Sequence, residues 1–287
     1  TLAELIDVLD VTRLDDDRFR GETIPLRLSG GGASERTVVD GSQLLGQAIV
    51  AAVRREPGRV VKSAHMIFAR AASSEAPVDF EIDSLHSGRN FASLSVEVRQ
   101  AERSCARALI LLDGDAEDLV RRVEEAPSLP GPDQCEPFAL GTIGRDVRFV
   151  EGTDYVEPDK IGPPTLDVWV QFAECPKELA LCQALLAQMC GPLLIGVAMR
   201  PHPGLGESDA HRSLSTGVLT ITLHFHDPGP VDDWFLFRHE SVHVGRGLCD
   251  GIGRIYKSGK LVASFRQEGL LRSMPASATG LERTKLL

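Results

Sequence analysis

The 287-residue sequence lacks any block of basic residues. Its 31 Lys and Arg are outnumbered by 41 Asp and Glu, which gives a formal net charge of -10 and a pI near 5.3. Nucleic-acid binding depends on clustered basic side chains that neutralise phosphates. We therefore expect no nucleic-acid partner.

The sequence has no long apolar run, and we expect no secretory leader. Its first segment carries Glu4, Asp7 and Asp10 and no basic residue, unlike a signal peptide. The longest apolar run, residues 192–199, is far shorter than the roughly 20 residues that cross a bilayer. We expect a soluble, cytoplasmic protein without a membrane span.

Metal-ligand patterns are absent as well. The six cysteines form no CxxC pair and have no histidine at metal-ligand spacing, so we predict small buried side chains and no metal site. His224 and His226 alternate on one predicted strand but have no third ligand. Nothing around Cys190 indicates an activated thiol.

What the first half does contain is one long amphipathic segment followed by several short ones. Apolar residues at spacings of one, three and four over residues 43–54 predict a helix that is buried against a sheet. Four segments with alternating or apolar patterns then predict an antiparallel meander: residues 60–70, 78–85, 91–100 and 105–112.

The second half repeats this order after a segment rich in acidic residues and proline. A predicted helix over residues 178–189 precedes predicted strands over residues 216–226, 234–243, 251–257 and 261–271. One offset relates three pairs of like residues, Phe68 with Phe225, Arg89 with Arg246 and Ala106 with Ala263 (263 − 106 = 157). We infer an internal duplication with domains 1–115 and 144–287 and a linker over 116–143.

Periodicity alone leaves two architectures open, an ordinary pair of α+β domains and a duplicated helix-wrapping sheet. Motifs favour the second. The informative stretches are GSQLLGQA, HSGRNFASLSVEVRQ, VLTITLHFHDP, WFLFRHESVHVGRG and GKLVASFRQEGLLR. Through them the chain resembles the acyl-CoA thioesterase II family in both halves. The resemblance implies an α+β double hot-dog fold, hydrolysis of fatty acyl-CoA to fatty acid and CoA without a metal or organic cofactor, and a homodimer or larger homo-oligomer.

The family resemblance also implies a catalytic trio that holds and activates a water: an aspartate on the second central helix, a Ser or Thr, and a Gln on the last strand. Thr222 matches the hydroxyl position and Gln267 the amide position. Gly191, however, stands where the resemblance places the aspartate, and Thr220 and Ile221 depart from the motif before Thr222. The carboxylate that accepts the water's proton is thus missing from its expected place.

Residues in the first half offer a replacement. Asp40 precedes Gly41 at the predicted N-terminus of the first long helix. His65 occupies the position in the first repeat that Thr222 occupies in the second (222 − 65 = 157). We hypothesise that Asp40 and His65 line a substrate pocket; the alternative is a helix-capping Asp and a packed strand His.

A predicted tight turn offers a second contact with substrate. Gly88 and Arg89 occupy this turn, where Arg89 contacts either a CoA phosphate or an acidic neighbour. Both interpretations are compatible with an exposed arginine.

Three functions follow from these residues. The first is an acyl-CoA thioester hydrolase, which Thr222 and Gln267 favour. The second is an acyl-CoA or CoA binding or regulatory protein of the same fold, which Gly191 favours. The third, a dehydratase or hydratase, requires an Asp/His pair that no motif supplies.

Overall fold

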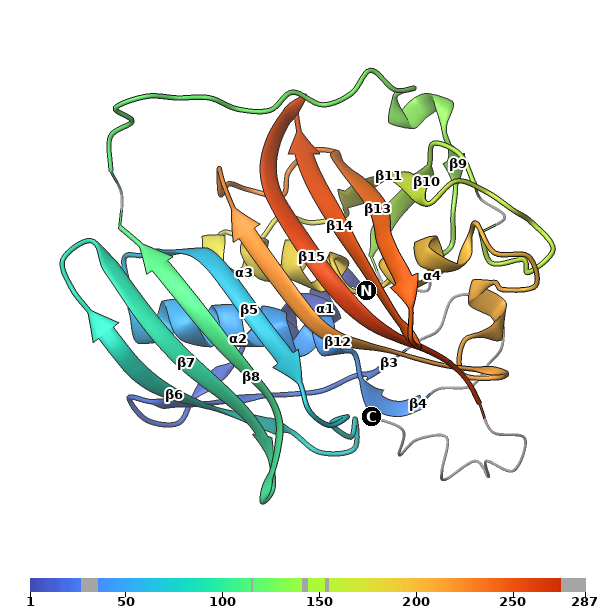
Figure 1. Ribbon diagram of the computed structural model, residues 1–287. Helices are drawn as coiled ribbons and strands as arrows, with labels where there is room; N and C mark the ends of the chain where they lie inside the picture. Colours follow the sequence, from blue (N-terminus) through green and yellow to red (C-terminus); the bar gives the residue numbers. More distant parts are fainter. Residues whose placement is uncertain (27–35, 115, 141–143, 153–154, 275–287) are drawn as a thin grey trace.

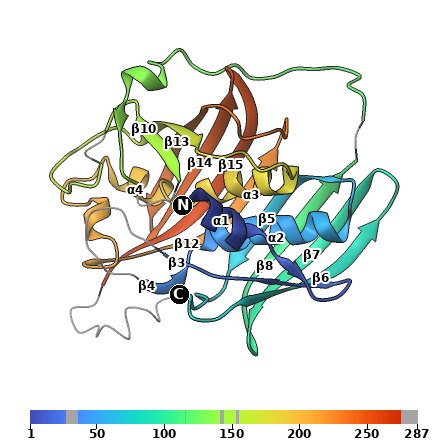
Figure 2. The ribbon, with the colours of Figure 1, turned by 180° about the vertical axis from the view of Figure 1, so that it is seen from behind.

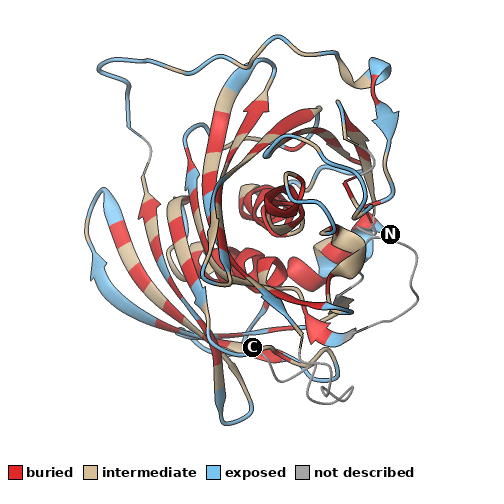
Figure 3. Ribbon diagram, turned by 45° about the vertical axis from the view of Figure 1, so that its right-hand side comes forward, coloured by how far each residue is buried: buried red, intermediate tan, exposed pale blue. Residues whose placement is uncertain are grey.

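The computed structural model describes residues 1–26, 36–114, 116–140, 144–152 and 155–274. Its main feature is a 13-stranded sheet, antiparallel at every strand pair, that curves around the helices (Figure 1). Figure 3 shows buried residues concentrated on the enclosed helices and alternating along the strands around them. This alternation reflects a sheet with one face on the core and the other toward solvent.

The first half contains one long helix and the strands that wrap it. Its helices are α1 (Leu2–Leu9) and α2 (Gly41–Arg55). Its strands are β1 (Thr12–Arg13), β2 (Arg18–Gly21), β3 (Pro25–Leu26), β4 (Arg36–Val39), β5 (Val60–Phe68), β6 (Val78–Ser87), β7 (Phe91–Gln100) and β8 (Arg103–Asp113). The predicted helix and the four predicted strands are confirmed, but only β6, β7 and β8 form a meander, because β5 pairs with β8 and not with β6.

The second half has the same plan with two consecutive helices. They are α3 (Leu179–Met189) and α4 (Leu194–Met199), with short 3-10 turns η1 (Pro132–Gln134) and η2 (Glu207–Asp209) elsewhere. The strands are β9 (Glu136–Pro137), β10 (Arg145–Phe149), β11 (Thr165–Phe172), β12 (Leu214–Phe225), β13 (Phe235–Gly245), β14 (Leu248–Lys257) and β15 (Lys260–Ser273). Because β9 pairs with β10, part of the segment that we interpreted as linker belongs to the sheet.

The predicted repeat reappears in the strand boundaries. Strands β6 and β13 begin 157 residues apart (235 − 78), as do β7 and β14 (248 − 91) and β8 and β15 (260 − 103). The strand order β6-β7-β8-β5-β12-β15-β14-β13 is symmetric about the β5/β12 pair. His65 lies opposite Thr222 in that pair, so the pseudo-two-fold axis that relates the halves passes between these two residues.

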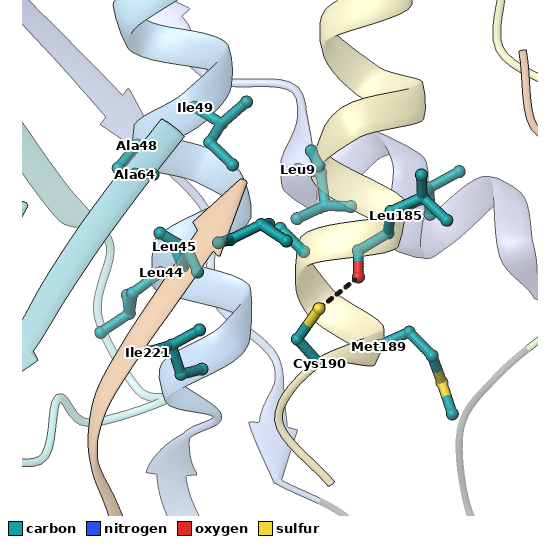
Figure 4. Packing of buried hydrophobic residues seen from close by; sticks show 14 of the residues in the cluster. Leu9, Leu44, Leu45, Ala48, Ile49, Ala64, Leu185, Met189, Cys190 and Ile221 are labelled. Atoms are coloured by element: carbon teal, nitrogen blue, oxygen red, sulfur yellow. Dashed lines mark hydrogen bonds between the residues drawn. The ribbon is translucent and has the colours of Figure 1, made fainter. Parts of the chain in front are cut away.

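Helices α2 and α3 pack side by side and run antiparallel inside the sheet (Figure 2). Arg54 near the end of α2 donates to Glu178 at the start of α3 at 2.8 Å, whereas Gln188 near the end of α3 donates to Asp40 at the start of α2 at 3.1 Å. Figure 4 shows the apolar side chains between the helices and the sheet. The labelled residues are Leu9, Leu44, Leu45, Ala48, Ile49, Ala64, Leu185, Met189, Cys190 and Ile221.

The antiparallel arrangement has a direct consequence for polar chemistry. It brings the N-terminus of one central helix against the C-terminus of the other. Residues 40 and 188, which are far apart in sequence, therefore become neighbours.

The stretch Leu179–Met199 is long and apolar enough in composition to cross a membrane. In this structure 89% of the most apolar 18-residue segment within this stretch is buried inside the protein. The stretch therefore lies in the core, where α3 packs against α1, α2 and β5 and α4 packs against strands β12 to β15. Figure 1 shows both helices behind the sheet.

Candidate active site

Asp40, the N-cap of α2, is the central residue of the candidate site. Its carboxylate accepts hydrogen bonds from the main-chain N–H of Ser42 at 3.0 Å and from the Ser42 hydroxyl at 2.7 Å. Gln188 Nε2 donates a third bond to the same carboxylate, at 3.1 Å. The capping interpretation is therefore confirmed, but the contact with Gln188 goes beyond what a helix cap requires.

Gly191 lies directly beside this carboxylate. A Cβ atom at Gly191 would stand 3.5 Å from Asp40 Oδ1 and only 2.6 Å from Ser42 Oγ. The chain thus places a carboxylate next to the position from which the family resemblance expects one to project. The carboxylate comes from the first-half helix, and Ser42 fills the space that an aspartate side chain at 191 would need.

Gln267 on β15 reaches the same turn from the sheet. In the amide orientation that satisfies its neighbours, its nitrogen donates to the carbonyl oxygens of Cys190 at 2.9 Å and Gly191 at 3.2 Å. Because Gln267 is 2% exposed, these bonds fix a buried amide against the end of α3. Gly191 therefore contacts both Gln267 and the Asp40 cluster.

The surroundings of Asp40 shift its protonation. Burial of the carboxyl group raises the pKa of Asp40 above its ordinary value of 3.8, and the bonds from Ser42 and Gln188 and the charge of Arg145 oppose this shift. A carboxylate with a raised pKa is a stronger base than an exposed one. Asp40 is therefore suited to accept a proton from water.

Sequence reasoning missed Arg145, which approaches the cluster from β10. Its side chain shares the inner face of that strand with the buried Val147 and Phe149. Burial lowers the pKa of Arg145 to about 10, and the charge of Asp40 partly offsets this effect. No motif pointed to this residue, because it lies at the edge of the segment that we interpreted as linker.

Gln188 was also missed, although the sequence held a weak signal. It is one of two glutamines, with Gln183, in the largely apolar helix α3, and it is 7% exposed. Such a residue needs hydrogen-bond partners inside the fold, and Asp40 is the one that the structure provides.

Thr222 does not join this cluster. It lies opposite Arg266 on β15, whereas Gln267 lies opposite Ile221. Since directly opposed residues share one face of a sheet, Thr222 and Gln267 point to opposite faces. Figure 4 shows Ile221 on the inner face, among the core residues. The prediction that Thr222 and Gln267 hold one water between them is wrong.

His65 follows Thr222 to the outer face. Its Nδ1 lies 2.7 Å from Thr222 Oγ1 across the β5/β12 pair. The hypothesis that His65 and Asp40 line one pocket is therefore wrong as well, because Asp40 lies inside the sheet with α2 and α3. The alternative of a strand histidine packed against its neighbours fits the structure.

Gly88 and Arg89 lie near the other end of α2. Gly88 closes the β6/β7 hairpin by donating to Phe91 O at 2.9 Å, and its carbonyl accepts from Arg59 beyond the end of α2. A 15-residue helix is about 22 Å long, so this turn is far from Asp40. Arg89 is exposed, and its contact with a CoA phosphate or with an acidic neighbour stays a prediction.

Gly41 is the first residue of α2, next to Asp40. A Cβ atom at Gly41 would stand 2.9 Å from the ring of Phe68, so the glycine allows this ring to pack against the first helical turn. A substrate-binding role for Gly41 stays a prediction.

The cysteines lie mainly in the core. Five of the six are buried and Cys175 is exposed, and all six are free thiols. Cys190, beside Gly191, donates to Leu186 O at 3.2 Å (Figure 4). Burial raises the pKa of its thiol far above the usual value, which disfavours the thiolate that a nucleophile needs.

The comparisons with known proteins agree with this architecture. Residues 120–271 match the family model described as acyl-CoA thioesterase C-terminal domain, and residues 32–112 match the corresponding N-terminal domain. Acyl-CoA thioesterase 2 of Haemophilus influenzae is 27% identical over 94% of this chain and 98% of its own. Human acyl-coenzyme A thioesterase 8 is 26% identical over 93% of this chain and 88% of its own.

Solved structures show the same fold. The acyl-CoA thioesterase II TesB2 from Mycobacterium marinum superposes with a TM-score of 0.77 at 25% identity, over 96% of this chain and 100% of that one. A protein from Alicyclobacillus acidocaldarius described as having a hot dog fold gives a TM-score of 0.73 at 17% identity, covering 95% of this chain and 99% of that one. The predicted double hot-dog architecture is confirmed.

Proposed function

The chain belongs to the acyl-CoA thioesterase family and hydrolyses acyl-CoA thioesters, and on this premise we propose that Asp40 supplies the catalytic carboxylate. The observation that carries the proposal is the distance of 3.5 Å between Asp40 Oδ1 and a Cβ atom placed on Gly191. The family resemblance expects an aspartate to project from that position. In this chain the opposite central helix provides the carboxylate.

The proposed reaction uses one water molecule. Asp40 accepts a proton as the water oxygen attacks the thioester carbonyl carbon, and the tetrahedral intermediate collapses by breaking the C–S bond. The departing CoA sulfur then takes the proton from Asp40, so that the products are a carboxylic acid and free CoA. The partial positive charge at the N-terminus of α2 favours the developing oxyanion.

Neighbouring residues hold Asp40 in place for this step. Ser42 and Gln188 fix both of its oxygens, and Gln267 fixes the Gly191 turn. These three are positioning residues, because their bonds go to protein atoms. A base that is held in one orientation has little reorganisation to undergo during the reaction.

The test is the substitution Asp40→Asn, assayed by release of free thiol from a panel of acyl-CoAs. Asn also caps helices well, so the fold should be preserved, with a Tm no lower than that of wild type, while the base is lost. We expect kcat to fall on the order of 10²-fold to 10⁴-fold with a smaller change in KM. Asp15→Asn, in an exposed turn, is the matched control and should retain wild-type turnover.

Two results would contradict the proposal. Wild-type turnover in Asp40→Asn would exclude Asp40 as the base. A wild-type protein that binds acyl-CoA in calorimetry but releases no thiol would favour the acyl-CoA binding or regulatory alternative.

We further propose a cytoplasmic, homo-oligomeric protein. Six free thiols suit a reducing compartment. Ile67 and Leu109, each 53% exposed, lie on the outer faces of the adjacent strands β5 and β8 and give that face apolar surface for a second copy. Light scattering after gel filtration tests the assembly, and a monomer at micromolar concentration would contradict it.

A further inference from the structure

Arg145 carries a buried guanidinium group. All three of its guanidinium nitrogens are inaccessible to solvent, and none finds an acceptor in the described part of the chain. The guanidinium carbon lies 5.2 Å from the centroid of the Phe172 ring, the residue opposite Arg145 on β11. One face of the cation is thus covered by an aromatic ring, while its N–H groups stay unpaired.

Such an arrangement is costly for an isolated protein. Burying an unpaired charge costs several kcal/mol, and each unmade hydrogen bond adds to that cost. Buried guanidinium groups therefore normally meet a carboxylate, a phosphate or several carbonyl oxygens. The described residues supply no such acceptor, so the guanidinium N–H groups are available to a ligand.

Asp40 is not that acceptor. Its charge affects Arg145, and the charge of Arg145 affects Asp40, so the two groups are electrostatic neighbours. They form no ion pair, and Ser42 and Gln188 already donate to the Asp40 carboxylate. Gln188 Oε1, on the same side chain that binds Asp40, is a second buried atom without a partner.

These unpaired atoms belong to the neighbourhood of the proposed catalytic carboxylate. A substrate whose thioester carbon approaches Asp40 also comes close to Arg145, because the two charges act on each other. An acyl group that ends in a methyl would leave all the N–H groups of Arg145 unpaired. An acyl group with a second carboxylate would accept two parallel bonds from the guanidinium fork.

We propose that Arg145 binds a carboxylate carried by the acyl group, so that the preferred substrates are CoA thioesters of dicarboxylic acids. This inference rests on the proposed function, because the thioester must lie at Asp40. Phe172 holds the plane of the guanidinium, and the unpaired nitrogens receive the two carboxylate oxygens. The Asp40 carboxylate, held by its own three donors, stays available for the water.

The experiment compares acyl-CoAs of equal chain length with and without the terminal carboxylate. The pairs are succinyl-CoA with butyryl-CoA, glutaryl-CoA with valeryl-CoA, and adipyl-CoA with hexanoyl-CoA. For wild type we expect a higher kcat/KM for the carboxylated member of at least one pair. The ratio of kcat/KM for the carboxylated member to kcat/KM for the methyl-ended member should fall on the order of 100-fold in Arg145→Met. Arg145→Lys keeps the charge but cannot form two parallel hydrogen bonds, and should give an intermediate ratio.

A binding measurement separates this inference from the proposed function. In the Asp40→Asn background, calorimetry with glutaryl-CoA and valeryl-CoA reports recognition without turnover. A preference for glutaryl-CoA that Arg145→Met abolishes would support the inference even if the role of Asp40 fails. Thermal unfolding shows whether each variant is folded.

Two outcomes would overturn the inference. One is a wild-type preference for the methyl-ended member of every pair. The other is an equal effect of Arg145→Met on both members, which would assign Arg145 to the thioester itself. Either result leaves acyl-CoA hydrolysis intact, whereas failure to cleave any of the six thioesters would count against the hydrolase.

Discussion

The close approach of Gly191 to Ser42 is the geometric basis of the proposed site, and the substitution Gly191→Ala tests it. The added Cβ would lie 2.6 Å from Ser42 Oγ and 2.7 Å from Ser42 Cβ, which is too close for real atoms. One of the two helix ends must therefore move. The Asp40 carboxylate, bonded to Ser42, would move with it.

The expected cost follows from overpacking of a dense interior. Forcing one methyl group into such a site costs about 1–3 kcal/mol. A chain of this size loses roughly 2 °C of Tm for each kcal/mol, so Tm should fall by roughly 2–6 °C. Ser42→Gly removes both clashing atoms and should recover most of that loss in the double variant, whereas Ser42→Ala removes only the hydroxyl and should recover less.

Urea unfolding of the wild type, the two single variants and the double variant gives the coupling energy between the positions. We expect a coupling above about 0.5 kcal/mol, the level at which independent sites cease to add. A Gly191→Ala protein as stable as wild type, or single effects that simply add, would refute the placement of Asp40 beside position 191. The same geometry implies that Gly191→Asp alone does not increase activity, because its side chain meets Ser42 first.

Two further predictions concern the polar residues. Thr222→Val should leave kcat/KM within about twofold of wild type and cost at most about 1 kcal/mol, because only the outer-face bond to His65 is lost; a hundredfold loss of activity would restore Thr222 to the site. The raised pKa of Asp40 predicts that activity falls as the pH drops through that pKa, above 3.8. Its contribution to stability runs the other way, being fully present below 3.8 and lost as the pH rises through the folded pKa. Asp40→Asn should therefore be more stable than wild type at neutral pH and equal to it in acid, as urea unfolding at several pH values would show.

The orientation of Thr222 could have been predicted from the sequence with a stricter use of alternation. Ile221, Leu223 and Phe225 are the apolar positions of that strand, so Thr222 belongs to the opposite face. Gln267 follows Phe265 by two residues and so shares the core face. Motif matching assigned both polar residues to one water because it compared residue types without comparing faces.

The sequence by itself determined the order of helix and strands and their repetition at an offset of 157, whereas the missing carboxylate at Gly191 was implied by the family resemblance. The order of helix and strands depends on local periodicity, which one chain segment carries without its neighbours. The neighbours of Gly191 depended on tertiary structure. Only the antiparallel packing of α2 and α3 brings Asp40 to Gln188 and Gly191, and only the tertiary fold buries Arg145 near Asp40. Contacts between residues more than a hundred positions apart depend on which apolar faces pack together, and local sequence patterns do not specify this packing.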